Sequence, residues 1–260
     1  MRIARYSVDE TIHYGVVDLE EDGTGNPDTV SELKGDPFAG PVSLSGVRHL
    51  LEDVRLLAPV LPRSKVIGIG KNSAASSPGE LPVVFLKPNT SVIGPTEAII
   101  LPDMSQKPVL EAELAIVISR ICRSVPAERV PEVIFGYTAA NDVTALDLMG
   151  DSIAWGVAKC WDTFTPLGPW IATHLSIEEA SMLKVSAEIG EESVTSGSVK
   201  NLLHGITDLV TFVSSIMTLL PGDVILTGAP GGNHLIEPGQ QVSVTIEQIG
   251  SLANPVMGES

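Results

Sequence analysis

Residues 111–118 read Glu-Ala-Glu-Leu-Ala-Ile-Val-Ile, an acidic pair that leads directly into an apolar run typical of a buried β-strand. Residues two positions apart in a strand project to the same face, so the carboxylates of Glu111 and Glu113 would converge on one side. By spacing alone, an acidic pair at the start of a strand is more often solvated surface than a functional site. Other segments of the chain have to decide between these two interpretations.

Short motifs on both sides of this strand share the pattern of one known family. They are Val84-Phe85-Leu86-Lys87-Pro88, Val92-Ile93-Gly94-Pro95, Phe135-Gly136-Tyr137-Thr138, Asn141-Asp142-Val143, Asp162-Thr163-Phe164, Pro221-Gly222-Asp223-Val224-Ile225 and Gly250-Ser251-Leu252-Ala253-Asn254-Pro255-Val256. With them, residues 54–256 resemble the fumarylacetoacetate hydrolase superfamily, specifically its short bacterial members. Those members include acylpyruvate hydrolases, oxaloacetate decarboxylases and 2-hydroxyhepta-2,4-diene-1,7-dioate isomerase-like enzymes.

The resemblance implies the family's fold, a mixed β-sandwich roll, and a homodimer. The sequence itself favours an α+β, beta-rich class, because 24 Gly and 19 Pro punctuate the chain and short strands outnumber helices. The clearest helix pattern spans 202–220, where apolar residues recur at three- and four-residue spacing. A proline-marked segment at 57–62 predicts a small N-terminal β-containing module at 1–60 and the catalytic domain at 61–260.

Four residues take chemical roles from the resemblance. In the family, both glutamates of Glu-x-Glu and the aspartate of Asn-Asp bind a divalent metal, which assigns this role to Glu111, Glu113 and Asp142. Hard oxygen ligands suit Mg²⁺ or Mn²⁺, whereas zinc would favour His or Cys. Lys159 matches the family's active-site lysine, whose ammonium could neutralise a substrate carboxylate or a developing enolate.

One segment departs from the family pattern. Hydrolases and decarboxylases of the family usually carry Gly-Arg-Asn-Tyr-x-x-His-x-x-Glu here, and its His/Glu dyad handles water. Residues 70–80 read Gly-Lys-Asn-Ser-Ala-Ala-Ser-Ser-Pro-Gly-Glu, so Ser76 stands at the histidine position and Gly79 at the glutamate position. We predict that the water-activating dyad is missing and that Lys71, at the arginine position, binds substrate.

Two further motifs change the expected pocket. The family commonly has Arg and Gln in Asn-Asp-x-Ser/Thr-x-Arg-Asp-x-Gln, where this chain has Leu146 and Met149. The family's Thr-Gly-Thr-Pro appears here with Ala229 in place of the second threonine, which removes a hydrogen-bond donor from the substrate site. We therefore expect a larger or more apolar pocket. The tryptophans, Trp155 among them, are expected to pack in the core or at its rim.

The predicted function is divalent-metal-dependent chemistry on an enolisable dicarbonyl or 2-oxo acid substrate, in which the site stabilises an enolate. Decarboxylation, tautomerisation and C–C bond rearrangement all use such a site. Two alternatives stay open. One is acylpyruvate hydrolysis or oxaloacetate decarboxylation, against which the missing His and Arg argue, and the other is a catalytically silent metal-binding scaffold.

Composition argues against several other classes. A formal net charge of −16 repels phosphate backbones and anionic lipid, so neither a nucleic-acid nor a membrane partner is expected. No apolar stretch has the length of a membrane span and the N-terminus lacks a signal-peptide pattern, which favours a cytoplasmic protein. Cys122 and Cys160 have no CxxC spacing, so neither a disulfide nor a thiolate zinc site is indicated.

Overall fold

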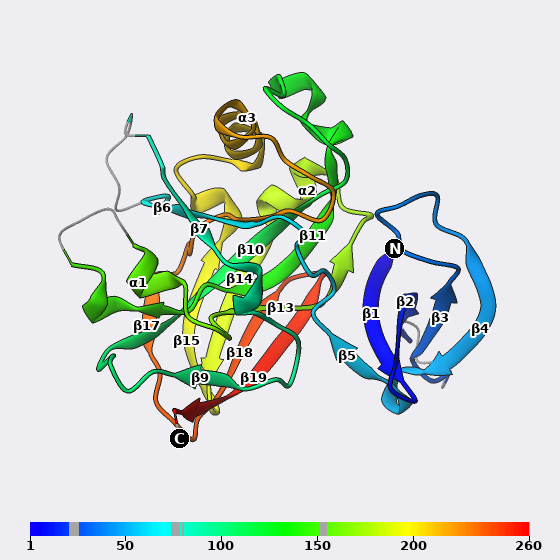
Figure 1. The fold of residues 1–260 in the computed structure, drawn as a ribbon, viewed down its shortest axis with the longest axis horizontal. Coiled ribbons are helices and arrows are strands. Elements are labelled where there is room, and N and C mark those ends of the chain that lie inside the picture. The colour runs from blue at the N-terminus through cyan, green and yellow to red at the C-terminus, as the bar shows by residue number, and fades with distance from the viewer. Residues whose placement is uncertain (21–25, 74–78, 80, 151–154, 260) are drawn as a thin grey trace.

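Strands dominate the computed structural model, which describes residues 1–20, 26–73, 79, 81–150 and 155–259. Within these ranges the strands form two mixed sheets, and the helices are few and short (Figure 1). The predicted α+β, beta-rich class is therefore confirmed. None of the described helices has the length and apolarity that a bilayer crossing needs.

The larger sheet contains fourteen strands in the described part of the chain. They are β1 (Arg2–Val8), β2 (Thr11–Asp18), β3 (Thr29–Leu33), β4 (Leu44–Leu50), β5 (Arg55–Leu57), β6 (Val66–Gly70), β7 (Val83–Lys87), β8 (Val92–Ile93), β10 (Pro108–Ile118), β11 (Ile134–Asn141), β12 (Thr144–Ala145), β13 (Thr165–Ala172), β16 (Val224–Leu226) and β17 (Asn233–Leu235). Their order is β4-β3-β2-β1-β13-β11-β10-β16-β6-β7, while β5 pairs with β1, β8 with β13, and β12 and β17 with β10. The 11-residue strand β10 thus has partners on both sides.

The smaller sheet packs against the central strands of the larger one. It consists of β9 (Ile99–Leu101), β14 (Lys184–Ile189), β15 (Glu192–Ser198), β18 (Gln241–Ile246) and β19 (Gly250–Gly258), in the order β15-β14-β18-β19-β9. Alternate residues of β10 serve different cores: Leu114 packs in the core that includes Val244 of the smaller sheet, and Ala115 packs in a second core. Because Glu111 and Glu113 share the parity of Ala115, they project away from the smaller sheet.

The helical segments are α1 (Gly156–Lys159), α2 (Ile177–Met182), α3 (Ile206–Ile216) and the 3₁₀ turns η1 (Leu51–Asp53), η2 (Asn89–Ser91), η3 (Ala127–Glu132), η4 (Leu146–Leu148) and η5 (Val199–Asn201). The helix predicted over 202–220 is wrong at both ends. It begins only after Gly205, whose N–H donates to the Asp208 side chain at 3.3 Å. It ends at Ile216 because the backbone of Leu219 pairs with Cys122 in both directions, at 2.9 and 3.0 Å, which requires an extended chain.

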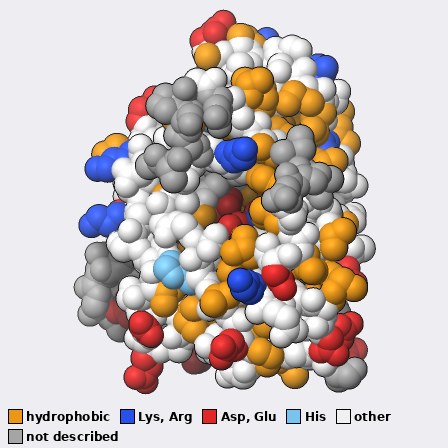
Figure 2. Space-filling model, turned by 90° about the vertical axis from the view of Figure 1, so that its left-hand side faces the viewer, with side chains coloured by type: hydrophobic (Ala, Val, Ile, Leu, Met, Phe, Trp, Pro, Cys, Tyr) orange, Lys and Arg blue, Asp and Glu red, His pale blue; other side chains and the backbone are white. Residues whose placement is uncertain are grey.

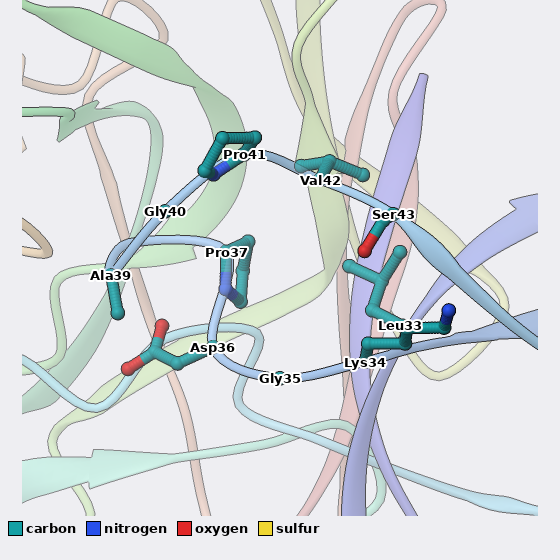
Figure 3. Close-up of a pocket in the computed structure, with 10 residues that line it drawn as sticks. All are labelled: Leu33, Lys34, Gly35, Asp36, Pro37, Ala39, Gly40, Pro41, Val42 and Ser43. Atoms are coloured by element: carbon teal, nitrogen blue, oxygen red, sulfur yellow. The ribbon is translucent and has the colours of Figure 1, made fainter.

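The first sixty residues hold β1 to β5, which lie to one side of the molecule (Figure 1). The start of β1 pairs with β13 through Arg2 and Ala172, so the larger sheet continues into this region. The loop between β3 and β4 folds back on itself and encloses a cavity of about 240 Å³ (Figure 3). The N–H of Lys34 donates to Ser43 O at 2.9 Å and closes this loop. The division at residue 60 stays a prediction, since one sheet crosses it.

Candidate active site

Pairing between β10 and β11 brings three carboxylates together. Glu111 and Glu113 stand two residues apart on β10, and Asp142 follows β11 directly. The N–H of Asp142 donates to Glu111 O at 2.9 Å, which fixes the two segments relative to each other. As a result, one oxygen from each of the three side chains lies within 4.8 Å of the others.

Lys159, the last residue of α1, joins this carboxylate cluster. Its Nζ donates to Oε2 of Glu111 at 2.6 Å and to Oδ2 of Asp142 at 2.5 Å. Its side chain is only 4% exposed. The structure therefore brings the lysine singled out from the sequence into direct contact with two of the three predicted metal ligands.

A second lysine in the cluster, Lys87, was missed by the sequence reasoning. It ends β7, its side chain is fully buried, and its ammonium donates to Oδ1 of Asp142. The remaining donors reach the backbone oxygens of Val143 at 3.2 Å and Phe164 at 2.7 Å. The sequence signal that could have identified it is a lysine at the end of a buried strand, directly before Pro88. A buried ammonium needs a charged partner, so such a lysine indicates a carboxylate close by.

Burial and mutual attraction or repulsion set the pKa values of this cluster. Burial raises the pKa of Glu113 well above its ordinary value of 4.5, and the neighbouring Asp142 and Glu111 carboxylates raise it further. Burial also raises the pKa of Asp142, but Lys159 and Lys87 outweigh it, so the pKa lies below its ordinary value. Burial lowers the pKa of Lys159, but attraction by Asp142 and Glu111 is stronger, so the pKa is raised and the ammonium stays charged.

These groups open into a cavity of about 360 Å³. All seven residues predicted to form the site line it: Glu111, Glu113, Asp142, Lys159, Lys71, Leu146 and Ala229. Figure 2 shows a hollow with acidic side chains inside it and hydrophobic side chains along its border. Phe85, Met149 and Trp155 also line the cavity, a role that the sequence reasoning did not assign to Trp155.

A buried asparagine holds the wall of the cavity that carries Lys71. The amide nitrogen of Asn72 donates to Thr227 O at 2.7 Å and to His204 O at 3.1 Å, and its oxygen accepts from the N–H of His204 at 2.7 Å. Lys71 itself has a positive φ of 55°. Asn72 therefore fixes the backbone in the conformation that turns Lys71 toward the cavity. Ser76, the other departure in this segment, lies outside the described residues.

The carboxylate cluster fits a divalent metal. Its three carboxylates are hard oxygen donors close enough to share one ion, which matches Mg²⁺ or Mn²⁺ better than zinc. Glu113 is 2% exposed, and the one hydrogen bond that the structure gives its side chain comes from the N–H of Gly228 at 2.7 Å. A buried carboxylate beside two others needs either a proton or additional positive charge, and a divalent ion supplies that charge.

Comparison with known proteins places the chain in a family. Residues 64–257 match the fumarylacetoacetate (FAA) hydrolase C-terminal family, and residues 1–59 match the Rv2993c-like N-terminal family. The chain therefore belongs to the fumarylacetoacetate hydrolase family, as the sequence motifs predicted.

Two relatives cover nearly the whole chain. Protein Rv2993c of Mycobacterium tuberculosis is 42% identical over 265 residues, which cover 99% of this chain and 98% of that protein. The mitochondrial oxaloacetate tautomerase Fahd2a of Rattus norvegicus is 33% identical over 266 residues, which cover 94% of this chain and 84% of that protein.

Solved structures agree over the full length of both chains. A 5-carboxymethyl-2-hydroxymuconate delta-isomerase from Mycobacterium smegmatis superposes with a TM-score of 0.91 at 45% identity, covering 100% of each chain. A maleylpyruvate hydrolase from Sphingobium sp. SYK-6, in complex with manganese(II) and pyruvate, superposes with a TM-score of 0.81 at 27% identity, again covering 100% of each. The family around this chain thus includes isomerases, tautomerases and hydrolases.

Proposed function

We propose that this protein is a divalent-metal-dependent enzyme that binds an enolisable 2-oxo or dicarbonyl acid and stabilises its enolate, with keto–enol tautomerisation as the favoured reaction. The observation that carries the proposal is the convergence of three carboxylates and the charged Lys159 in one cavity. Relatives named as an isomerase and a tautomerase support the reaction class.

Glu111, Glu113 and Asp142 would hold Mg²⁺ or Mn²⁺. When bound, the ion polarises a carbonyl oxygen and lowers the free energy of negative charge that develops there. The maleylpyruvate hydrolase in complex with manganese(II) and pyruvate supports the binding of a divalent metal and of a small 2-oxo acid. Gly228 holds Glu113 in place through its N–H, and Lys87 holds Asp142.

Lys159 keeps a proton at Nζ beside the carboxylates. Because its pKa is raised, it acts as a fixed positive charge and hydrogen-bond donor for an enolate oxygen or a substrate carboxylate rather than as a base. Lys71 lies on another wall of the cavity and offers a second ammonium to a substrate carboxylate, while Leu146 and Ala229 contact the apolar part of the substrate.

Tautomerisation fits these residues better than hydrolysis does. A tautomerase moves one proton between carbon and oxygen, whereas a hydrolase must also activate a water molecule. Among the described residues that line the cavity there is no histidine, and Ser76 and Gly79 occupy the positions of the family's water-handling dyad. Decarboxylation and C–C rearrangement use the same enolate and are the second candidates.

The test combines metal binding with an isotope measurement. Chelator-treated protein is titrated with Mg²⁺ and Mn²⁺ by calorimetry, and oxaloacetate and phenylpyruvate are then incubated in D₂O and followed by NMR. Metal-dependent deuterium exchange at C3 of either compound, with the carbon skeleton intact, is the expected result. Formation of pyruvate and CO₂ from oxaloacetate would make decarboxylation the reaction instead.

Lys159→Met separates an enzyme from a metal-binding scaffold. We expect the variant to bind Mg²⁺ at least as tightly as the wild type, because a competing positive charge is gone, and to lose exchange by about 10²-fold or more. Glu192→Gln, an exposed strand carboxylate outside the site, is the control. If the protein is only a metal-binding scaffold, the wild type itself will bind metal but show no metal-dependent exchange.

We also propose a homodimer, because the resemblance to the short bacterial members of the family implies one, and a cytoplasmic location, which the bacterial relative favours. Light scattering coupled to size exclusion measures the mass directly. A mass near that of the 27.4 kDa chain would contradict the dimer.

A further inference from the structure

We infer that the cavity has two chemically different ends, and that Trp155 and Phe85 make its second end a selector for an uncharged planar substituent on C3 of the substrate. This inference rests on the proposed function, because the first end has to hold the 2-oxo acid head group. It narrows the substrate class to 2-oxo acids with an aromatic or conjugated, uncharged tail.

Two glycines of β6 make room for the two rings. A Cβ on Gly68 would lie 2.1 Å from Cζ of Phe85, and a Cβ on Gly70 would lie 2.0 Å from Cζ3 of Trp155. Neither distance is compatible with any side chain, so both rings lie directly on the strand backbone. The rings are 5.4 Å apart between centroids and inclined at 60°. The strand thus provides a fixed floor for an aromatic wall of the cavity.

Phe85 connects this aromatic wall to the charged cluster. Lys159 Nζ lies 5.0 Å from the centroid of the Phe85 ring, and the same Nζ donates hydrogen bonds to Glu111 and Asp142. A substrate whose head group lies at the carboxylates and Lys159 can therefore extend its tail past Phe85 toward Trp155, whose ring centroid is 5.4 Å from that of Phe85. Leu146 and Met149 line the same cavity, so the tail meets apolar side chains.

The charge of the site matches a substrate with one carboxylate. The described charged groups in and directly behind the cavity are three carboxylates and three ammonium groups, namely Glu111, Glu113, Asp142, Lys71, Lys87 and Lys159. They cancel, so a divalent ion leaves two positive charges. The enolate of a 2-oxo monocarboxylic acid carries two negative charges, one on each oxygen-bearing group. A carboxylate on the tail would add a third negative charge, which exceeds the two positive charges that the ion leaves on the whole group.

Two ligands with the same head group test the preference for an uncharged tail by binding alone, without turnover. N-phenyloxamate and N-oxalylglycine share an oxamate head and cannot enolise, but the first has a phenyl tail and the second a carboxylate tail. Calorimetry with saturating Mg²⁺ should show that the wild type binds N-phenyloxamate about tenfold or more tightly than N-oxalylglycine. Binding of either should require the metal.

Substitutions at the second end of the cavity show which residues cause the preference for N-phenyloxamate. Trp155→Ala should weaken N-phenyloxamate binding by about tenfold and leave N-oxalylglycine within about twofold, while Trp155→Phe recovers most of the loss. With phenylpyruvate as substrate, Trp155→Ala should raise KM and leave kcat nearly unchanged. Leu146→Arg should reverse the ligand preference. Trp161→Phe, at a tryptophan that does not line the cavity, is the matched control.

The outcomes separate the two proposals. N-oxalylglycine binding as tightly as N-phenyloxamate, or Trp155→Ala weakening both ligands equally, would overturn the inference even if metal-dependent exchange is observed. The ligand preference without any exchange would leave the inference standing and overturn the proposed reaction. If neither ligand binds to the metal-loaded protein, the inference is overturned, and metal-dependent exchange alone decides the proposed reaction.

Discussion

Lys65–Asp223 and Lys159–Asp142 are both ion pairs on a buried aspartate, with Nζ–Oδ2 distances of 2.6 and 2.5 Å. Around Asp223 the charges balance one to one. Its Oδ2 accepts from Lys65 Nζ and from the N–H of Leu220 at 2.9 Å, and its Oδ1 accepts from the N–H of Lys65 at 3.2 Å. Around Asp142, two lysines face three carboxylates, and the group opens into a cavity.

The difference shows how one type of contact serves two purposes. The Asp223 pair has enough donors within the chain and joins the residue before β16 to the residue before β6, so it stabilises the fold. The Asp142 cluster has one carboxylate more than it has ammonium groups in contact with it, and Glu113 is left with a raised pKa. Such a deficit of positive charge costs stability in the free protein and gives binding energy to a cation.

The largest effect is expected for Glu113→Gln, which keeps the shape and removes the charge. Without the third carboxylate, metal affinity should fall by about 10- to 100-fold and kcat/KM by about 10³-fold. The unfolding free energy of the metal-free variant should equal or exceed that of the wild type, because a carboxyl group with a raised pKa is costly to ionise. Calorimetry, turnover and urea unfolding check the three statements, and unchanged metal affinity would contradict the assigned role.

Lys87→Met should cost about 3–5 kcal/mol of unfolding free energy, because Asp142 and two backbone oxygens lose a buried donor. Saturating Mg²⁺ should recover part of this loss, since the ion replaces the missing positive charge. Urea unfolding with chelator and with Mg²⁺ measures both values. A loss that is identical under the two conditions would show that Lys87 supports only the fold.

Asp223→Asn should cost about 3 kcal/mol, because an amide nitrogen cannot accept from Lys65 Nζ or the N–H of Leu220. The cost should be the same with chelator and with Mg²⁺, and metal affinity should not change. A metal-dependent cost at this pair would remove the distinction between the two clusters.

The smallest effect is the pH dependence of the metal site. Because the pKa of Glu113 is raised, the folded protein holds its proton above the ordinary value of 4.5, and stability falls as the pH rises from there to the raised pKa. Over the same window a metal has to displace this proton, so affinity should rise by up to about tenfold per pH unit. Calorimetry in two buffers of different ionisation enthalpy should detect up to about one proton released per ion. Glu113→Gln should release none from this position.

Much of the fold and of the candidate site could be predicted from the sequence. The period of two in residues 111–117 places Glu111 and Glu113 on one face wherever the strand lies, because side-chain direction in a strand is a local property. The motifs predicted the family, and two of the short strands, β7 and β9, end directly before a proline, Pro88 and Pro102. The helix predicted over 202–220 was wrong at both ends, and at its C-terminal end backbone pairing of Leu219 with Cys122 outweighs the apolar period.

Only the tertiary structure decided which residues meet. Lys87 contacts Asp142 across 55 positions of sequence, and Lys159 contacts Glu111 across 48, through tertiary packing that no local pattern specifies. The aromatic wall likewise depends on β6 presenting two glycines beneath rings that come from β7 and from the residue before α1. The sequence determined which chemical groups are available, because motifs and periodicity are properties of residues that are close together along the chain. Their convergence into a metal-binding end and an aromatic end arises from long-range packing, where burial and charge depend on every segment at once.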